Sequence, residues 1–152
     1  MPLERLRRIC DEIPYHDGAG DLLSGLRRAT MKVGIVSTGL RLLADRVRAE
    51  HHLDFVLAND LVSRGGAVTG EVTIDIEHGR KDGALRRFCE AFRLPPERVA
   101  AVGDTEGDIS MFRAAGWSIA FNAADENVER EASAVAAGAD LRSLLPLLRR
   151  AR

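Results

Sequence analysis

The feature that most constrains this fold is a set of four short runs of mainly apolar residues. Segments in which apolar side chains recur at helical spacing lie between or after these runs. The helical spacing is clear over residues 84–92, where Ala84, Leu85, Phe88 and Phe92 share one face. Short apolar strands that alternate with helices are typical of parallel sheets covered by helices. The sequence therefore predicts an α/β fold, with a Rossmann-like parallel sheet and flanking helices. The four predicted strands are residues 33–36, 55–58, 99–102 and 118–121.

Two other segments depart from this alternation. Residues 61–76 show a period of two around Gly65-Gly66, which predicts a β-hairpin appended to the sheet edge. The leucine-rich segment 141–148 carries Pro146, which is expected to end or kink any helix there. No repeat, low-complexity tract or linker divides the chain, so we expect residues 1–152 to form a single domain.

Charge and cysteine content exclude several classes of protein. The 22 basic and 23 acidic side chains give a net charge of -1, without the basic excess of a nucleic-acid or anionic-membrane binder. Neither a signal peptide nor a membrane-spanning run is recognisable. Two cysteines do not make a disulfide framework, and Cys89 falls on the apolar face of its predicted helix. We expect a cytoplasmic protein with neither nucleic acid nor membrane as its partner.

The most specific segment is the strand 100–102 that runs into Gly103-Asp104 and, four residues later, Asp108. Function in parallel sheets concentrates at the carboxyl ends of strands. A carboxylate exposed there could bind a hard cation such as Mg²⁺, with the second acid binding a metal-bound water or orienting a neighbour. The alternative is a plain turn in which Asp104 or Asp108 caps the helix over residues 109–115.

Two weaker signals accompany it. Ser37-Thr38-Gly39 follows a strand and precedes a helical pattern, where a hydroxyl and free N–H groups could bind an anion, although helix capping is the alternative. Lys81 is one of two lysines beside twenty arginines, at the expected start of a helix. Its ammonium could reach a phosphoryl group, or it could be an exposed surface charge. The four histidines, including His78, have no metal-ligand spacing and are interpreted as surface residues.

Taken in order, these three segments resemble motifs two, three and four of the haloacid dehalogenase phosphatases. The resemblance is closest to the phosphoserine phosphatase branch and extends from about residue 13 to the C-terminal leucines. The segments that add to it are Ile13-Pro14, Gly18-Ala19, Ala58-Asn59, Val68-Thr69-Gly70, Asp108-Ile109-Ser110-Met111-Phe112 and Ile119-Ala120-Phe121-Asn122-Ala123.

The resemblance implies hydrolysis of a small phosphorylated metabolite through an aspartyl-phosphate held by Mg²⁺. Ser37 would hydrogen-bond the phosphoryl oxygens, assisted by the backbone of Thr38 and Gly39. Lys81 would neutralise charge on the nucleophile and the phosphoryl group. Asp104 would coordinate Mg²⁺, with Asp108 close behind it. Such a site works by positioning and charge compensation.

The family's first motif, a strand ending in Asp-x-Asp, is not found in the sequence. Its first aspartate is the nucleophile and its second the general acid and base. The nearest patterns, Asp75-Ile76-Glu77 and Asp104-Thr105-Glu106, both carry glutamate at the second acid position and follow motif two. Smaller departures are Thr38, where the branch usually has glycine, and Gly107, where it usually has asparagine.

The missing motif also affects the expected fold, because the resemblance places its strand between the strands that lead to Ser37 and to Asp104. Residues 1–12 then correspond to the remnant of a cap helix, and we expect a truncated or split phosphatase that is inactive alone. The sequence leaves open a homodimer or a complementing N-terminal segment that pairs the free edges. The alternative function is a non-catalytic module that binds phosphate or a partner.

Overall fold

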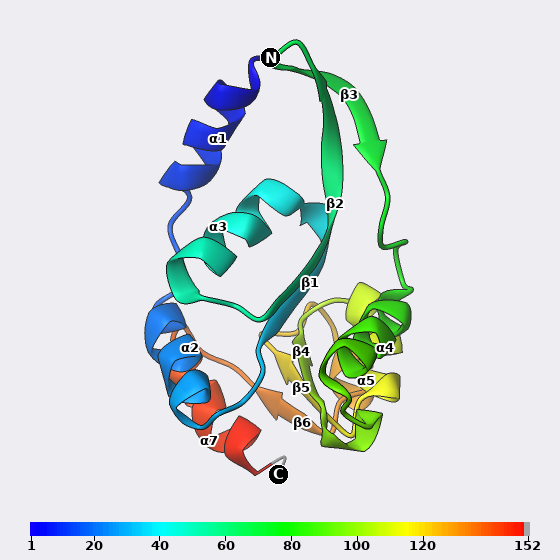
Figure 1. The fold of residues 1–152 in the computed structure, drawn as a ribbon. Helices are drawn as coiled ribbons and strands as arrows, with labels where there is room; N and C mark the ends of the chain where they lie inside the picture. The colour runs from blue at the N-terminus through cyan, green and yellow to red at the C-terminus, as the bar shows by residue number, and fades with distance from the viewer. Residues whose placement is uncertain (151–152) are drawn as a thin grey trace.

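The computed structural model describes residues 1–150, in which two small sheets lie between two groups of helices (Figure 1). The helices are α1 (Leu3–Glu12), α2 (Ala19–Arg28), α3 (Arg41–His51), α4 (Lys81–Phe92), α5 (Ile109–Ala114), α6 (Glu126–Arg130) and α7 (Leu144–Arg149). The strands are β1 (Gly34–Leu40), β2 (Phe55–Arg64), β3 (Ala67–Thr73), β4 (Ala100–Gly103), β5 (Trp117–Phe121) and β6 (Ala134–Ala136). Short 3-10 turns η1 (Pro96–Arg98), η2 (Glu106–Asp108) and η3 (Leu141–Ser143) complete the fold.

The strands form two separate three-stranded sheets, in the orders β1-β2-β3 and β4-β5-β6. Strands β1 and β2 are parallel, as are β4, β5 and β6. The predicted parallel α/β architecture is confirmed, and the sheet is divided where the sequence suggested a missing strand. Within residues 1–150, β1 and β4 each have one hydrogen-bonded neighbour, and a cavity of about 670 Å³ lies between them.

The predicted hairpin is also present, and it begins earlier than expected because β2 runs unbroken from the sheet into the hairpin. Strand β3 pairs with it in antiparallel fashion. Gly65 and Gly66 both have positive φ, 57° and 78°, which the tight turn requires. The backbone of Met1 and Leu3 bonds to the tip of the hairpin, so the start of α1 is attached there, and the helix runs from this tip toward α3 (Figure 1).

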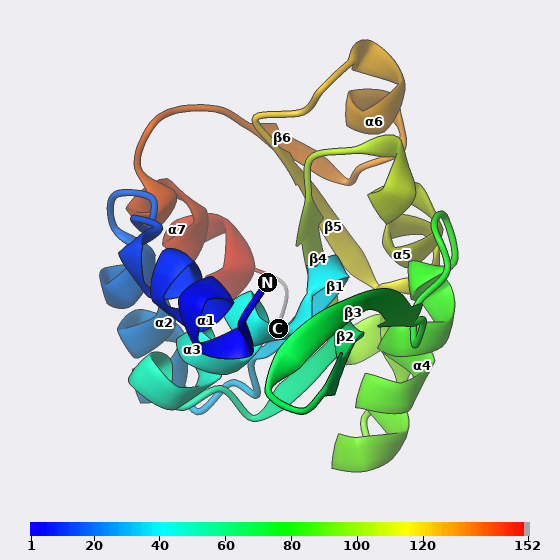
Figure 2. The same cartoon turned by 90° about the horizontal axis from the view of Figure 1, so that it is seen from above.

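Helices cover both sides of the strands, with α2, α3 and α7 on one side and α4 and α5 on the other (Figure 2). One core cluster packs α4 and α5 against β4 and β5 and includes Cys89, as expected for that cysteine. A second packs α2 and α7 against β5 around Ile119 and Leu144. Both cysteines are free thiols. No helix in residues 1–150 is long and apolar enough to cross a bilayer.

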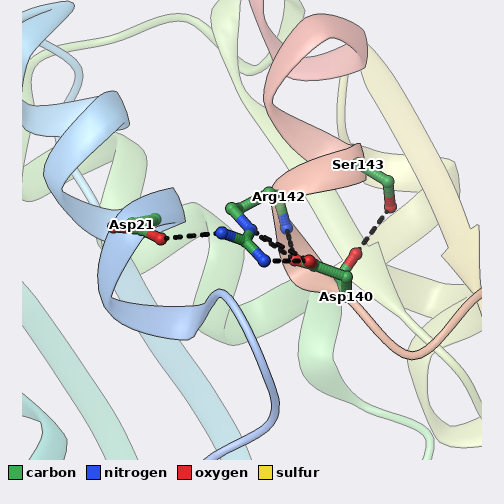
Figure 3. Close-up of polar contacts among 4 residues, drawn as sticks. All are labelled: Asp21, Asp140, Arg142 and Ser143. Carbon is green, nitrogen blue, oxygen red and sulfur yellow. Dashed lines mark hydrogen bonds and ion pairs between the residues drawn. The ribbon is translucent and has the colours of Figure 1, made fainter.

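The C-terminal segment is tied to α2 by a charged side chain. Figure 3 shows the Arg142 guanidinium between Asp140 and Asp21. Its Nε lies 2.9 Å from Asp140 Oδ2, and its Nη1 lies 3.4 Å from Asp21 Oδ2. Helix α7 runs through Pro146, so of the two effects expected of this proline, ending or kinking the helix, the first is wrong. Pro146 lies in the first turn of α7, where a backbone N–H would have no acceptor within the helix. The lack of an N–H in proline therefore costs little stability at this position.

Asn59 fixes the segment that leads into α4. Its side chain is buried on β2 and makes four hydrogen bonds. The amide nitrogen donates to the carbonyls of Thr38 and Ile76, at 3.0 and 3.1 Å. The amide oxygen accepts from the N–H groups of Asp75 and Ile76, both at 2.9 Å. One side chain therefore connects the loop after β1 to the residues before α4.

We predict that Asn59→Ala lowers the free energy of unfolding by about 3 kcal/mol, because it leaves buried backbone groups without partners. Asn59→Asp keeps the two acceptor bonds and loses the two donor bonds, so we expect it to destabilise as well. The exposed Asn127 is the matched control, and Asn127→Ala is expected to change stability by about 0.5 kcal/mol or less. Urea denaturation of the three variants measures these differences. Equal stability of Asn59→Ala and Asn127→Ala would contradict the role given to Asn59.

Candidate active site

The turn after β4 is organised by one buried carboxylate, that of Asp108. Its Oδ2 accepts hydrogen bonds from the N–H groups of Asp104 and Thr105, at 3.0 and 3.1 Å, and from the Thr105 hydroxyl at 3.2 Å. Thr105 and Asp108 thereby cap the short turn η2 reciprocally. The side chain of Asp108 makes no capping bond to α5, so the alternative of a simple cap on that helix is wrong.

Gly103 makes room for this carboxylate. A Cβ atom at Gly103 would lie no more than 2.6 Å from three atoms of the Asp108 side chain. Any other residue would therefore displace Asp108 or the end of β4. The close approach of the Asp108 side chain to the backbone at position 103 explains why glycine occupies that position.

Lys81 meets the same carboxylate from α4. Its Nζ lies 2.5 Å from Asp108 Oδ1, and the two side chains are only 12% and 5% exposed. One residue along, the Asp82 N–H donates to the Ser110 hydroxyl at 3.3 Å. The start of α4 is thus fixed to the turn after β4. Lys81 is not the exposed surface charge that was the alternative for it.

The pKa of Asp108 is set by opposing effects. Burial raises it, but the hydrogen bond and charge of Lys81 and the N–H donors of Thr105 and Asp104 outweigh burial and lower it below the ordinary value of 3.8. Asp108 therefore stays ionised at neutral pH. Its negative charge is matched by Lys81 within a largely dry part of the site.

The Asp104 carboxylate differs from that of Asp108 in being exposed. It has no hydrogen bond or ion pair among the part of the chain that is described, although its backbone bonds to Asp108 and Ala124. No group of three or more His, Cys, Asp or Glu side chains suited to hold a metal occurs in residues 1–150. The carboxylate oxygen atoms of Asp104 are thus free to bind Mg²⁺, as are those of the exposed Glu106 in the same turn.

Ser37, Thr38 and Gly39 lie at the end of β1 rather than in a helix cap. The Ser37 hydroxyl accepts from the Gly39 N–H at 3.0 Å. Leu40 precedes α3 without a side-chain capping bond, so neither hydroxyl caps that helix. Thr38 is tied through Asn59 to the segment before α4, which places the end of β1 on the same side as Lys81. No hydrogen bond joins Ser37 to Lys81 within residues 1–150.

Sequence reasoning gave no structural role to two residues that shape this region. Asn59 is a lone amide in the apolar β2, and that contrast is a signal that could have revealed it. His78 is exposed, as expected, but its imidazole lies over Gly107: a Cβ at Gly107 would stand 3.3 Å from His78 Cε1. The imidazole of His78 therefore occupies the space that a larger side chain at position 107 would need.

We predict that Asp108→Asn lowers the free energy of unfolding by about 3 kcal/mol at pH 7, because Lys81 loses its buried partner. The pKa of the Asp108 carboxyl group is lower in the folded state than the value of 3.8 expected in the unfolded chain. Its ionised form therefore stabilises the fold at pH values above 3.8, and this stabilisation is lost as the pH falls through the pKa of the folded state. Asp108→Asn should therefore reduce the acid destabilisation seen below about pH 4. Denaturation at pH 3 to 7, with the exposed Asp45→Asn as control, measures both effects. An unchanged pH profile in Asp108→Asn would contradict this assignment.

Comparisons with known proteins identify the family of the chain. The model of the haloacid dehalogenase-like hydrolase family matches residues 2–116. The phosphoserine phosphatase of Idiomarina loihiensis is 39% identical over 119 residues, which are 78% of this chain and 54% of that protein. The enzyme of the same name from Methanocaldococcus jannaschii is 28% identical over 98% of this chain and 71% of its own.

A solved structure described as a substrate-bound phosphoserine phosphatase complex superposes with a TM-score of 0.90. It is 28% identical and covers 97% of this chain and 70% of its own. The chain spans only 54% and 36% of the Idiomarina and Archaeoglobus fulgidus proteins that it matches. With a family match over most of its length, a two-sided α/β fold and a lysine–aspartate pair at the carboxyl end of β4, the chain belongs to the haloacid dehalogenase-like hydrolases.

Proposed function

We propose that this chain provides the phosphate-binding and Mg²⁺-binding part of a phosphomonoesterase of the phosphoserine phosphatase type. The observation that carries the proposal is the contact of Lys81 with the turn that presents Asp104, beside the end of β1 that carries Ser37. A cation, a hydroxyl and an unpaired carboxylate on this side suit a phosphate monoester and a hard dication. The names of the relatives support phosphoserine as the substrate.

Each residue has a distinct role in this proposal. Ser37 and the backbone of Thr38 and Gly39 bind phosphoryl oxygens, and Lys81 neutralises their charge. Asp104 would hold Mg²⁺, while Asp108 positions Lys81 and the Asp104 loop. Mg²⁺, when bound, would stabilise the negative charge that develops on the phosphoryl oxygens.

The nucleophile is the part of the machinery that these 152 residues do not supply. The sequence contains no Asp-x-Asp, so the aspartyl-phosphate of the family has no matching residue here. We therefore assign the nucleophile to a polypeptide segment outside the given sequence. The same observation favours a second candidate, a non-catalytic module that binds phosphate or a partner.

We predict that the chain alone binds inorganic phosphate more tightly in the presence of Mg²⁺ and that Asp104→Asn removes this enhancement. Titration calorimetry with and without Mg²⁺ measures it, and Asp45→Asn is the charge-matched control on α3. Ser37→Ala and Lys81→Ala should weaken phosphate binding whether or not Mg²⁺ is present. Phosphate affinity that Mg²⁺ and Asp104→Asn leave unchanged would favour the non-catalytic module.

We also predict negligible turnover of p-nitrophenyl phosphate by this chain alone, with Mg²⁺ present, because no positioned nucleophile is available. Robust turnover that Asp104→Asn abolishes would overturn this assignment. Asp75, which lies 3.5 Å from the Arg41 guanidinium in the segment before α4, would then be the first residue to test as nucleophile.

A further inference from the structure

The imidazole of His78 lies beside the proposed phosphate site and has no part in the roles given above. It lies over Gly107, in the turn that contains Asp104 and Asp108. A Cβ atom at position 107 would stand 3.3 Å from His78 Cε1 and 3.5 Å from His78 Nδ1. Gly107 is buried, whereas His78 is exposed. The ring therefore faces the turn with its Nδ1–Cε1 edge, while the side chain remains open to solvent.

The main chain that carries His78 is fixed on both sides. Two residues before it, the N–H and the C=O of Ile76 both bond to the side-chain amide of Asn59. Three residues after it, Lys81 is paired with Asp108. The residues between these two attachments therefore have little freedom to move.

These residues form a tight turn. The N–H of Arg80 donates to the carbonyl of Glu77 at 3.1 Å. Gly79, the third residue of the turn, has a φ of 73°, a value that glycine adopts without strain. His78 is the second residue of the turn. The turn and its two attachments therefore hold the imidazole over Gly107.

The site that His78 borders has acidic groups in excess. The ammonium group of Lys81 is matched by the carboxylate of Asp108, 2.5 Å away. The carboxylates of Asp104 and Glu106 are exposed in the same turn. A phosphate dianion close to these carboxylates is repelled unless a cation or further hydrogen-bond donors offset their charge. An additional donor beside this turn would therefore favour phosphate binding.

The two arginines nearest to His78 in the sequence are already paired. Arg80 Nε lies 3.6 Å and Arg86 Nη2 lies 2.7 Å from the carboxylate of Asp82. The His78 imidazole, in contrast, makes no hydrogen bond or ion pair within residues 1–150. An imidazole keeps at least one N–H donor in either protonation state. His78 is therefore a side-chain donor at this turn that is free to bind a ligand.

We propose that His78 is a phosphate-binding residue, whose imidazole donates an N–H to a phosphoryl oxygen from the space beside Gly107. The proposal rests on the proposed phosphatase function, because it adds a residue to the same phosphate site. His78 and Lys81 then reach the phosphate from one segment of the chain. The lack of a side chain at position 107 provides the room for the ring. The ligand is a phosphate group, either free or in a monoester.

Titration calorimetry of the full chain with inorganic phosphate tests this role. We expect His78→Ala to weaken phosphate binding about fivefold, with and without Mg²⁺, because one hydrogen bond to the anion is lost. His78→Gln keeps an N–H donor and should recover most of the affinity. The exposed His16, in the segment before α2, is the matched control, and His16→Ala should bind like the unmodified chain. Unchanged affinity in His78→Ala, or a loss seen only with Mg²⁺, would overturn the proposal.

A variant at position 107 tests whether the ring acts from the space beside Gly107. The methyl groups of Gly107→Val need the space of the imidazole, so this variant should weaken phosphate binding about as much as His78→Ala does. When Gly107→Val is added to His78→Ala, no further loss is expected, because the two changes remove the same contact. Additive losses in the double variant would overturn the placement of the phosphate contact beside Gly107.

The imidazole NMR signals of the unmodified chain give a measurement that does not depend on how any variant folds. Phosphate added at constant pH should shift the ring signals of His78 and leave those of His16 unchanged, and unshifted His78 signals at saturating phosphate would overturn the proposal. Phosphate binding that Ser37→Ala and Lys81→Ala weaken but His78→Ala does not would overturn the role of His78 alone. No phosphate binding by the unmodified chain would contradict the proposed phosphatase function as well.

Discussion

The ion pair between Lys81 and Asp108 is the interaction on which the site depends, because it connects the half of the molecule that contains the β1-β2-β3 sheet to the half that contains the β4-β5-β6 sheet. Lys81 begins α4, which packs against β1, and Asp108 closes the turn after β4. The Asp108 carboxylate uses one oxygen for Lys81 and the other for the turn. Gly103 leaves the space that this side chain fills. Burial of such a pair adds little stability by itself, but removing one partner is costly.

Apart from this ion pair, the two halves are held together by helix packing rather than by hydrogen bonds between strands. Helix α4 packs against β1 and α5 alike, and Val36 of β1 contacts the core cluster around α4 and α5. Phe88 of α4 meets Phe55 of β2 edge-on, with ring centroids 5.5 Å apart. Side-chain packing therefore holds β1 and β4 near one another although no hydrogen bond of a sheet joins them.

Local sequence signals were sufficient to predict most of the helices and strands and the turn of the hairpin. Short runs of mainly apolar residues indicated β1, β2, β4 and β5, and Gly65-Gly66 indicated the hairpin. The short β6, Ala-Val-Ala, has too few residues to show a period of two. Pro146 was misjudged because its effect depends on its position within the helix, which the sequence alone does not give.

Contacts between distant residues were harder to predict than the elements that carry them. The motif residues Lys81 and Asp108 were identified from the sequence, yet their direct contact joins positions 27 residues apart and depends on how α4 packs. His78 acts on space that belongs to another segment and has no local signature. The amide of Asn59 stands out in β2, but the backbone groups that it bonds belong to other segments and are not marked in the sequence. Helix capping by Ser37 or Thr38 was a reasonable local alternative, and the extension of β1 to Leu40 removes it.

The arrangement of Lys81 also bears on how a phosphate could be recognised. An ammonium group has three donors, and Asp108 Oδ1 is the acceptor to which Lys81 is bonded in residues 1–150. Two donors are therefore left for further oxygen atoms, while the ion pair fixes the position of the nitrogen. A cation that is held in place before its ligand arrives loses less conformational entropy on binding. Because Asp108 draws its other hydrogen bonds from the turn itself, this preorganisation comes entirely from the chain described here.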